Sequence, residues 1–141
     1  MNLVEFYSLI FTDTLFANLA FSFTGEVALQ TVSAFNNHNI FITLIVVISA
    51  SMLAYIANYY LGKITFSIIK PLQNEKGQEN NDFFIALKNN KIFRLFLFLS
   101  AMSIYGKFIV FFAGVARLCF KQVLLISFIA KLFYYSFILI F

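Results

Sequence analysis

The sequence is poor in charged residues, cysteine, histidine and proline. Only 11% of its 141 residues are charged, against about 25% in a typical soluble domain. Hydrophobic residues account for 62%, and so short a chain could not bury that much apolar surface in a water-soluble fold. Long apolar runs with few charges form helices in a bilayer. The composition therefore predicts an all-α integral membrane protein.

The scarcity of cysteine, histidine and acidic residues argues against most enzyme chemistry. The single Cys119 can form neither an internal disulfide nor a thiolate metal cage, and we expect an inert, packed thiol. The single His38 lies in a polar turn, residues 36–39, away from any catalytic spacing. The six acidic residues are scattered, and no phosphate-loop or metal-ligand motif occurs. We therefore predict no catalysis, no cofactor and no metal.

The net charge of +4 comes from basic residues that are spread along the loops. A nucleic-acid-binding protein would gather them in one patch, so no nucleic-acid partner is predicted. Lys and Arg beside apolar runs are instead typical of cytoplasmic loops. Near the N-terminus, Glu5 and Asp13 stand where a cleavable signal peptide would be basic. We expect the apolar segments themselves to direct insertion.

Two apolar runs are candidates for plain transmembrane helices. The first extends from Ile40 to Leu61 and is expected to end at Gly62-Lys63, and the second extends from Val123 to Phe141. Both suit a hydrocarbon core of about 30 Å, which takes about 20 residues of helix. The second run carries Lys131 near its middle, a costly position for a cation without a partner.

Two further runs, each uncharged except at one point, are interrupted by a glycine beside a charge. Residues 14–35 contain Gly25-Glu26, and residues 95–116 contain Gly106-Lys107. A charge at bilayer depth costs about 2.5 to 3.5 kcal/mol on insertion scales, so it normally faces a partner or water. A broken backbone is tolerated there only where protein or water satisfies the freed groups. The pattern predicts helix breaks at both glycines.

The other segments are expected to lie at the membrane surface. Met1–Thr12 forms a short apolar helix that cannot cross the bilayer. Residues 63–94 are polar and form a cytoplasmic loop. At the end of that loop, residues 82–94 mix Phe and Leu with Lys and Arg, which predicts a basic amphipathic helix on the membrane.

The charges discriminate between two topologies. With residues 63–94 inside, four full spans would place Arg117 and Lys121 outside and Glu5 and Asp13 inside, against the usual bias. If both broken runs enter and leave on one side, the basic pair lies inside and the acidic pair outside. We favour these re-entrant hairpins, with four plain spans as the alternative.

The re-entrant reading makes the chain an inverted repeat. Residues 1–141 then form a single membrane domain, in which a re-entrant hairpin followed by a transmembrane helix occurs at 12–62 and again at 92–141. The two copies enter from opposite faces of the membrane. Repeats of this kind meet near the midplane, where broken helices form substrate and ion sites.

Three motifs in order carry a resemblance to a known family. Residues 23–29, Phe-Thr-Gly-Glu-Val-Ala-Leu, look like a Pro-Gly-Glu/Asp re-entrant motif, and residues 58–63 look like a Tyr-x-x-Gly-Arg/Lys helix end. Residues 99–107, followed by Ala113-Gly114 and Ala130-Lys131, look like the second half of the same pattern. From about residue 11 to 135 the chain resembles the DedA family (the VTT, or SNARE-associated Golgi, domain), particularly its short YqaA-like branch.

The resemblance implies a fold and a class of activity. It implies two opposed re-entrant loops in the inner membrane of a bacterium, and an activity that moves or scrambles lipids, including polyprenyl-phosphate carriers, in envelope homeostasis. The family's acidic re-entrant residue falls on Glu26, and its upstream acidic position falls near Asp13.

The chain departs from the family at four positions. The motif prolines are replaced by Thr24 and Ser103, and the two arginines of longer members by Ser100 and Gly106. The adjacent Lys107 can supply a point charge, although without the planar fork of arginine. Transport of a phosphate headgroup by the family's usual arginines is therefore not expected.

Glu26 is the first candidate for a functional residue, with Lys107 and Lys131 as its expected partners. A carboxylate at depth suits a proton-linked role; alternatively it caps the half-helix that follows Gly25. A Glu26–Lys107 pair across the repeat axis would act as a structural latch. Because one acid faces two lysines, one cation could remain to attract an anionic headgroup. Lys131 could also snorkel to the interface, or lie uncharged.

Asn58 places an amide on the first transmembrane run. Such groups form interhelical hydrogen bonds more often than substrate contacts. From these residues we predict a lipid flippase or scramblase-like facilitator, with membrane lipids as partners and proton coupling as a further hypothesis. The alternative is a non-transporting membrane subunit whose buried charges stabilise the fold. The sequence does not indicate how many copies of the chain associate.

Overall fold

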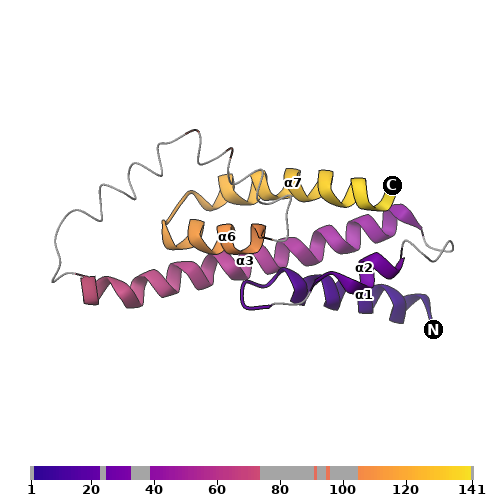
Figure 1. Cartoon of the computed structure of the whole chain (residues 1–141), viewed down its shortest axis with the longest axis horizontal. Coiled ribbons are helices and arrows are strands. Elements are labelled where there is room, and N and C mark those ends of the chain that lie inside the picture. Colours follow the sequence, from indigo (N-terminus) through magenta and orange to yellow (C-terminus); the bar gives the residue numbers. More distant parts are fainter. Residues whose placement is uncertain are drawn as a thin grey trace.

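The apolar runs of the sequence form helices. A computed structural model describes residues 2–22, 25–32, 39–73, 91, 95 and 105–140, and within these ranges the chain is all-helical, without strands. The helices are α1 (Leu3–Asn18), α2 (Val27–Val32), α3 (Ile40–Gln73), α6 (Gly106–Val115) and α7 (Phe120–Ile140) (Figure 1).

Helix α3 is the long central element against which α1, α6 and α7 pack. It has 34 residues, about 51 Å at about 1.5 Å per residue. The sequence predicted an end at Gly62-Lys63, but the helix continues to Gln73. Gly62 does not cap this helix, because it lies inside it, buried against α6. The first part of the predicted 63–94 loop is therefore helical, and the amphipathic helix predicted at 82–94 falls almost entirely outside the described residues.

Helices α1 and α2 form a hairpin. Helix α1 begins in a capping box made by Asn2 and Glu5. It passes without interruption through the boundary at Thr12 that the sequence predicted, because nothing there breaks a helix. The chain then reverses, and the backbone N–H of Ala28 donates to the Asp13 carboxylate at 2.9 Å. The hairpin turn lies beside the middle of α3 (Figure 1).

Helices α6 and α7 form the second half of the described chain. Helix α6 begins at Gly106, with Tyr105 as its N-cap, so the predicted break coincides with a helix start. After α6 the chain turns at Arg117, whose φ of 52° is the one positive value among the non-glycine residues described. The Arg117 guanidinium lies 4.8 Å from the ring of Phe66 on α3. Helix α7 then runs back alongside α3 (Figure 1).

The surfaces of α3 and α7 are apolar. Both helices are long and apolar enough to cross a membrane by length and composition. Large hydrophobic side chains point outward from them, including Phe41 at 81% exposed and Phe137 at 65%. Lipid contact would remove this surface from water, as the composition predicts. Cys119, expected to be packed, is exposed directly before α7.

The crossing of α3 and α6 depends on two glycines. A Cβ atom on Gly62 would overlap the backbone carbonyl oxygen of Phe111, and a Cβ on Gly114 would overlap that of Tyr59. The two backbones therefore approach more closely than any larger residue allows, as at other small-residue crossings in membranes.

We expect Gly62→Ala and Gly114→Ala each to destabilise the protein. Forcing atoms into a packed contact costs about 1–3 kcal/mol, more than the gain of about 1 kcal/mol in helix propensity. Gly25→Ala is the control, because a Cβ there meets nothing within 4 Å. The measurement is unfolding of the purified protein in detergent; equal stability of all three variants and the native protein would contradict this packing.

Candidate functional site

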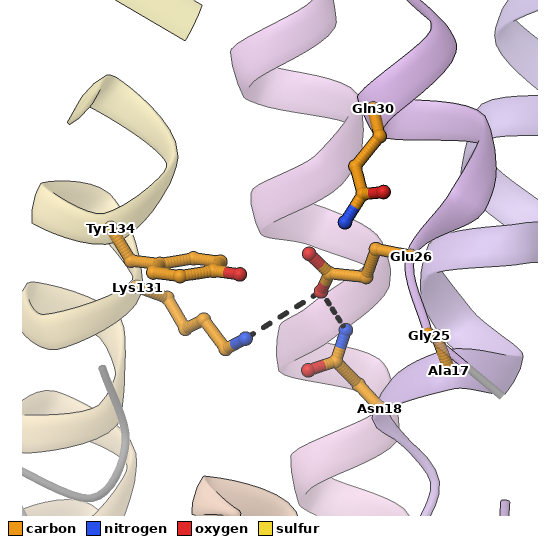
Figure 2. A pocket seen from close by; sticks show the side chains of 7 residues that line it. All are labelled: Ala17, Asn18, Gly25, Glu26, Gln30, Lys131 and Tyr134. Atoms are coloured by element: carbon orange, nitrogen blue, oxygen red, sulfur yellow. Dashed lines mark hydrogen bonds and ion pairs between the residues drawn. The ribbon is translucent and has the colours of Figure 1, made fainter. Parts of the chain in front are cut away.

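Several polar side chains converge around the carboxylate of Glu26, in the turn of the first hairpin (Figure 2). Its Oε1 accepts hydrogen bonds from Asn18 Nδ2 at 2.7 Å and from the Tyr135 hydroxyl at 2.6 Å. The same oxygen lies 3.6 Å from Lys131 Nζ. Oε2 is buried and has no hydrogen-bond partner among the described residues. One carboxylate oxygen is thus held from three sides, while the other accepts no hydrogen bond from the described residues.

Lys131 reaches Glu26 from the middle of α7. Ser127, Lys131 and Tyr135 are spaced by four residues, which places them on one helix face, and all three are buried. Lys131 Nζ lies 4.8 Å from the Tyr134 ring centre, 4.9 Å from that of Tyr135 and 5.8 Å from that of Tyr55. Ring faces attract a cation most strongly when it is desolvated. The ammonium is therefore held by a carboxylate and three tyrosine rings.

The predicted Glu26–Lys107 pair is not formed. Lys107 instead donates to the backbone carbonyls of Ala17 at 2.9 Å and Ser22 at 2.5 Å. Because α6 starts at Gly106, Lys107 lies in its first turn and meets the end of α1 rather than the carboxylate. The partner of Glu26 is the other lysine that the sequence proposed, Lys131, which neither snorkels nor lacks a partner.

Asn58 and Asp13 bond to the backbone of the hairpin. Asn58 is fully buried; its Nδ2 donates to the Asn18 carbonyl at 2.9 Å, and its Oδ1 accepts from the Ala20 N–H at 2.8 Å. Asn58 therefore makes interhelical hydrogen bonds, as its position on an apolar helix predicts. The Asp13 carboxylate accepts a hydrogen bond from the backbone N–H of Ala28 in the first turn of α2. Asp13 thus has the capping role that the sequence offered as the alternative for Glu26.

A cavity of about 50 Å³ lies beside the ion pair. Its lining residues are Ala17, Asn18, Gly25, Glu26, Gln30, Lys131 and Tyr134. Figure 2 shows the side chains of Gln30, Asn18 and Lys131 approaching the carboxylate from different sides. A cavity of this size admits a few water molecules, since one water occupies about 10–15 Å³ on this measure. The polar side chains among these residues can bind a ligand group that donates hydrogen bonds or carries charge.

Of the five proposed site residues, Glu26 and Lys131 line this cavity, whereas Asp13, Asn58 and Lys107 hold the hairpin. Sequence reasoning missed Asn18 and Tyr135. Tyr135 carried a usable signal, because it lies four residues after Lys131 and shares its face. Asn18 carried a weaker one, an amide within an apolar run.

Comparisons with known proteins find one informative relative. The chain is 31% identical to "Uncharacterized protein RP436" of Rickettsia prowazekii, and the match covers 96% of both chains. No family model matches the chain. No solved structure shows significant similarity to it.

We expect Asn58→Leu to destabilise the hairpin. The substitution leaves the Asn18 carbonyl and the Ala20 N–H without these bonds, and each buried unpaired group costs about 1–3 kcal/mol. Asn58→Gln keeps an uncharged amide with both a donor and an acceptor and should cost less. Hydrogen exchange at Ala20 reports the change locally; protection that persists in Asn58→Leu would contradict the role given to Asn58.

Proposed function

We propose that this chain, which belongs to the family of the Rickettsia protein RP436, is a multi-pass protein of a bacterial inner membrane. Its proposed activity is to facilitate the movement of lipids. The activity resembles that of a DedA-like flippase or scramblase. The ligand class is a lipid with a phosphate headgroup, either a polyprenyl phosphate or a phospholipid. The observation that carries the proposal is the Glu26–Lys131 pair, whose lysine is buried and whose carboxylate side chain is 13% exposed, beside a cavity that both residues line.

A re-entrant topology is supported by lengths and contacts. Helix α1 has 16 residues, about 24 Å of helix, less than a core of about 30 Å. Its partner α2 runs back alongside it, so both ends of the hairpin lie toward the start of α3 (Figure 1). Helix α6, with 10 residues, is shorter still. The first arm of the second hairpin falls largely outside the described residues.

The Glu26–Lys131 pair supports a role in lipid handling because an ion pair out of water is an unfavourable way to stabilise a fold. Burying two charges away from water is often unfavourable compared with an apolar pair of equal volume. Charged residues inside apolar helices therefore commonly mark substrate or ion pathways. Lys131 is the cation on the cavity, and a lipid phosphate would compete with Glu26 for it. A proton on Glu26 would weaken its hold on Lys131, which couples headgroup binding to proton uptake.

A second candidate function is a non-transporting membrane subunit. It is favoured by the way Lys107, Asn58 and Asp13 bond to the backbone. On this reading the Glu26–Lys131 pair completes the same set of internal contacts. The two functions differ in what happens when the charge of Glu26 is removed without disturbing the fold.

We expect Glu26→Gln to slow lipid movement at least about tenfold, since about 1.4 kcal/mol of lost transition-state binding has that effect. Glutamine keeps the shape and one acceptor oxygen but cannot pair with a lysine by charge. The measurement is movement of labelled phospholipid and polyprenyl phosphate across liposomes holding the purified protein. Asp13→Asn is the matched control, because it removes a carboxylate from the same hairpin away from the cavity.

Movement that continues unchanged in Glu26→Gln would remove the proposed role of the pair. Absence of movement in the native protein, with Glu26→Gln less stable, would favour the structural subunit. Loss of movement in both variants would trace the effect to the hairpin rather than to the cavity.

We expect residues 39 and 119 to be labelled from opposite sides of the membrane. Native Cys119 is exposed and serves as one probe; Asn39→Cys in a Cys119→Ser background is the other. Re-entrant hairpins leave one span, α3, between positions 39 and 119, whereas four plain spans add a second. Labelling of both positions by a membrane-impermeant maleimide from the same side would contradict the re-entrant topology.

A further inference from the structure

Lys107 is a buried cation that is held by backbone carbonyls. The residue is 4% exposed, and its Nζ donates to the carbonyl oxygens of Ala17 and Ser22. Among the described residues, the only ion pair joins the other buried lysine, Lys131, to Glu26. The ring of Phe108 lies 5.6 Å from Lys107 Nζ. The carboxylate of the site thus belongs to Lys131, and uncharged oxygens bind Lys107.

These carbonyls belong to a broken helix. Ala17 lies in the last turn of α1, and Ser22 lies in the turn that follows. Carbonyls in the last turn of a helix have no N–H partner within it, and they carry the negative end of the helix dipole. Neighbouring groups are bonded differently: the Phe16 carbonyl accepts from the N–H of Leu19, and the Asn18 carbonyl accepts from Asn58. The Ala17 carbonyl instead has an ammonium.

This arrangement has the chemistry of a monovalent-cation site. Unwound carbonyls and half-helix C-terminal ends coordinate Na⁺ in transporters, and backbone carbonyls replace the water shell of K⁺ in channels. An ammonium group is similar in size to K⁺ and is bound by the same oxygens. Its four-carbon stem, anchored on α6, brings it to the end of α1 without any dissolved ion.

We propose that the carbonyls of Ala17 and Ser22 form part of a monovalent-cation site that the chain fills with the ammonium of Lys107. Lys107 is therefore a positioning residue: it joins α6 to the turn of the first hairpin and does not bind a headgroup. The protein then needs no dissolved Na⁺ or K⁺ at this point. Shortening the side chain leaves a position that a small cation can occupy. This inference is independent of lipid movement.

The test measures thermal unfolding of Lys107→Ala in detergent at one ionic strength, with chloride salts of choline, sodium, potassium, ammonium and methylammonium. Choline is too large for the position and serves as the reference cation. We expect Lys107→Ala to unfold several degrees below the native protein in choline, and potassium, ammonium or methylammonium to recover a large part of the loss. The native protein and Lys121→Ala, which removes an exposed lysine of α7, should unfold at one temperature in all five salts.

Lys107→Met keeps the experiment decisive if Lys107→Ala does not fold. Methionine reaches as far as the Cε of lysine, so it retains the packing of the stem and leaves the Nζ position open. Recovery by small cations in either variant supports the site. Equal destabilisation in all salts would overturn it, because the ammonium would then matter only for packing. Full stability of Lys107→Met in choline would also overturn it, because the carbonyls would need no cation.

Discussion

The fold depends on one constraint: a helix that breaks away from water must find a partner for each backbone group it frees. The break after α1 meets this constraint with side chains from α1 itself and from two other helices, α3 and α6. Asn58 of α3 bonds both an N–H and a carbonyl of the turn, Lys107 of α6 bonds two carbonyls, and Asp13 of α1 bonds the first turn of α2. Three helices must therefore be in place before the turn is satisfied, which makes the hairpin a product of tertiary packing rather than of local sequence preference.

This use of polar groups divides the polar residues into two sets. The residues that hold the turn make hydrogen bonds to backbone groups. If they changed partners, those backbone groups would lose their hydrogen bonds. Glu26 and Lys131 bond through side chains instead, with Asn18 and Tyr135 completing their surroundings. Side-chain partners can change while the backbone stays bonded. The chemistry available to a ligand is therefore concentrated at the cavity, and the rigid framework lies beside it.

The sequence contained enough information for the helices but not for their contacts. Apolar runs predicted the helical class and two helices, α3 and α7, long enough to span a bilayer, and a glycine beside a charge preceded α2 and began α6. The end of α3 was not predictable, because Gly62 resembles a helix stop until its contact with α6 is known. The choice between two lysines for Glu26 was also open, since it depends on how far along α3 the helices α6 and α7 lie. Only the four-residue spacing of Lys131 and Tyr135 favoured the lysine of α7. That spacing shows that the two side chains share a helix face, but it does not show which residue they contact.

The opposite charges of Glu26 and Lys131 also determine how an electric field acts on this part of the molecule. In an energised bilayer, moving one elementary charge across the whole membrane involves about 2.3 kcal/mol per 100 mV. The two groups are 3.6 Å apart and carry no net charge together. Displacing them as a unit without rotation therefore involves no such work, and fully reversing the pair along the field involves at most about one-quarter of it, about 0.6 kcal/mol per 100 mV, in a core of about 30 Å. A rearrangement that keeps the pair together is almost independent of voltage, whereas one that separates the two charges draws directly on the membrane potential.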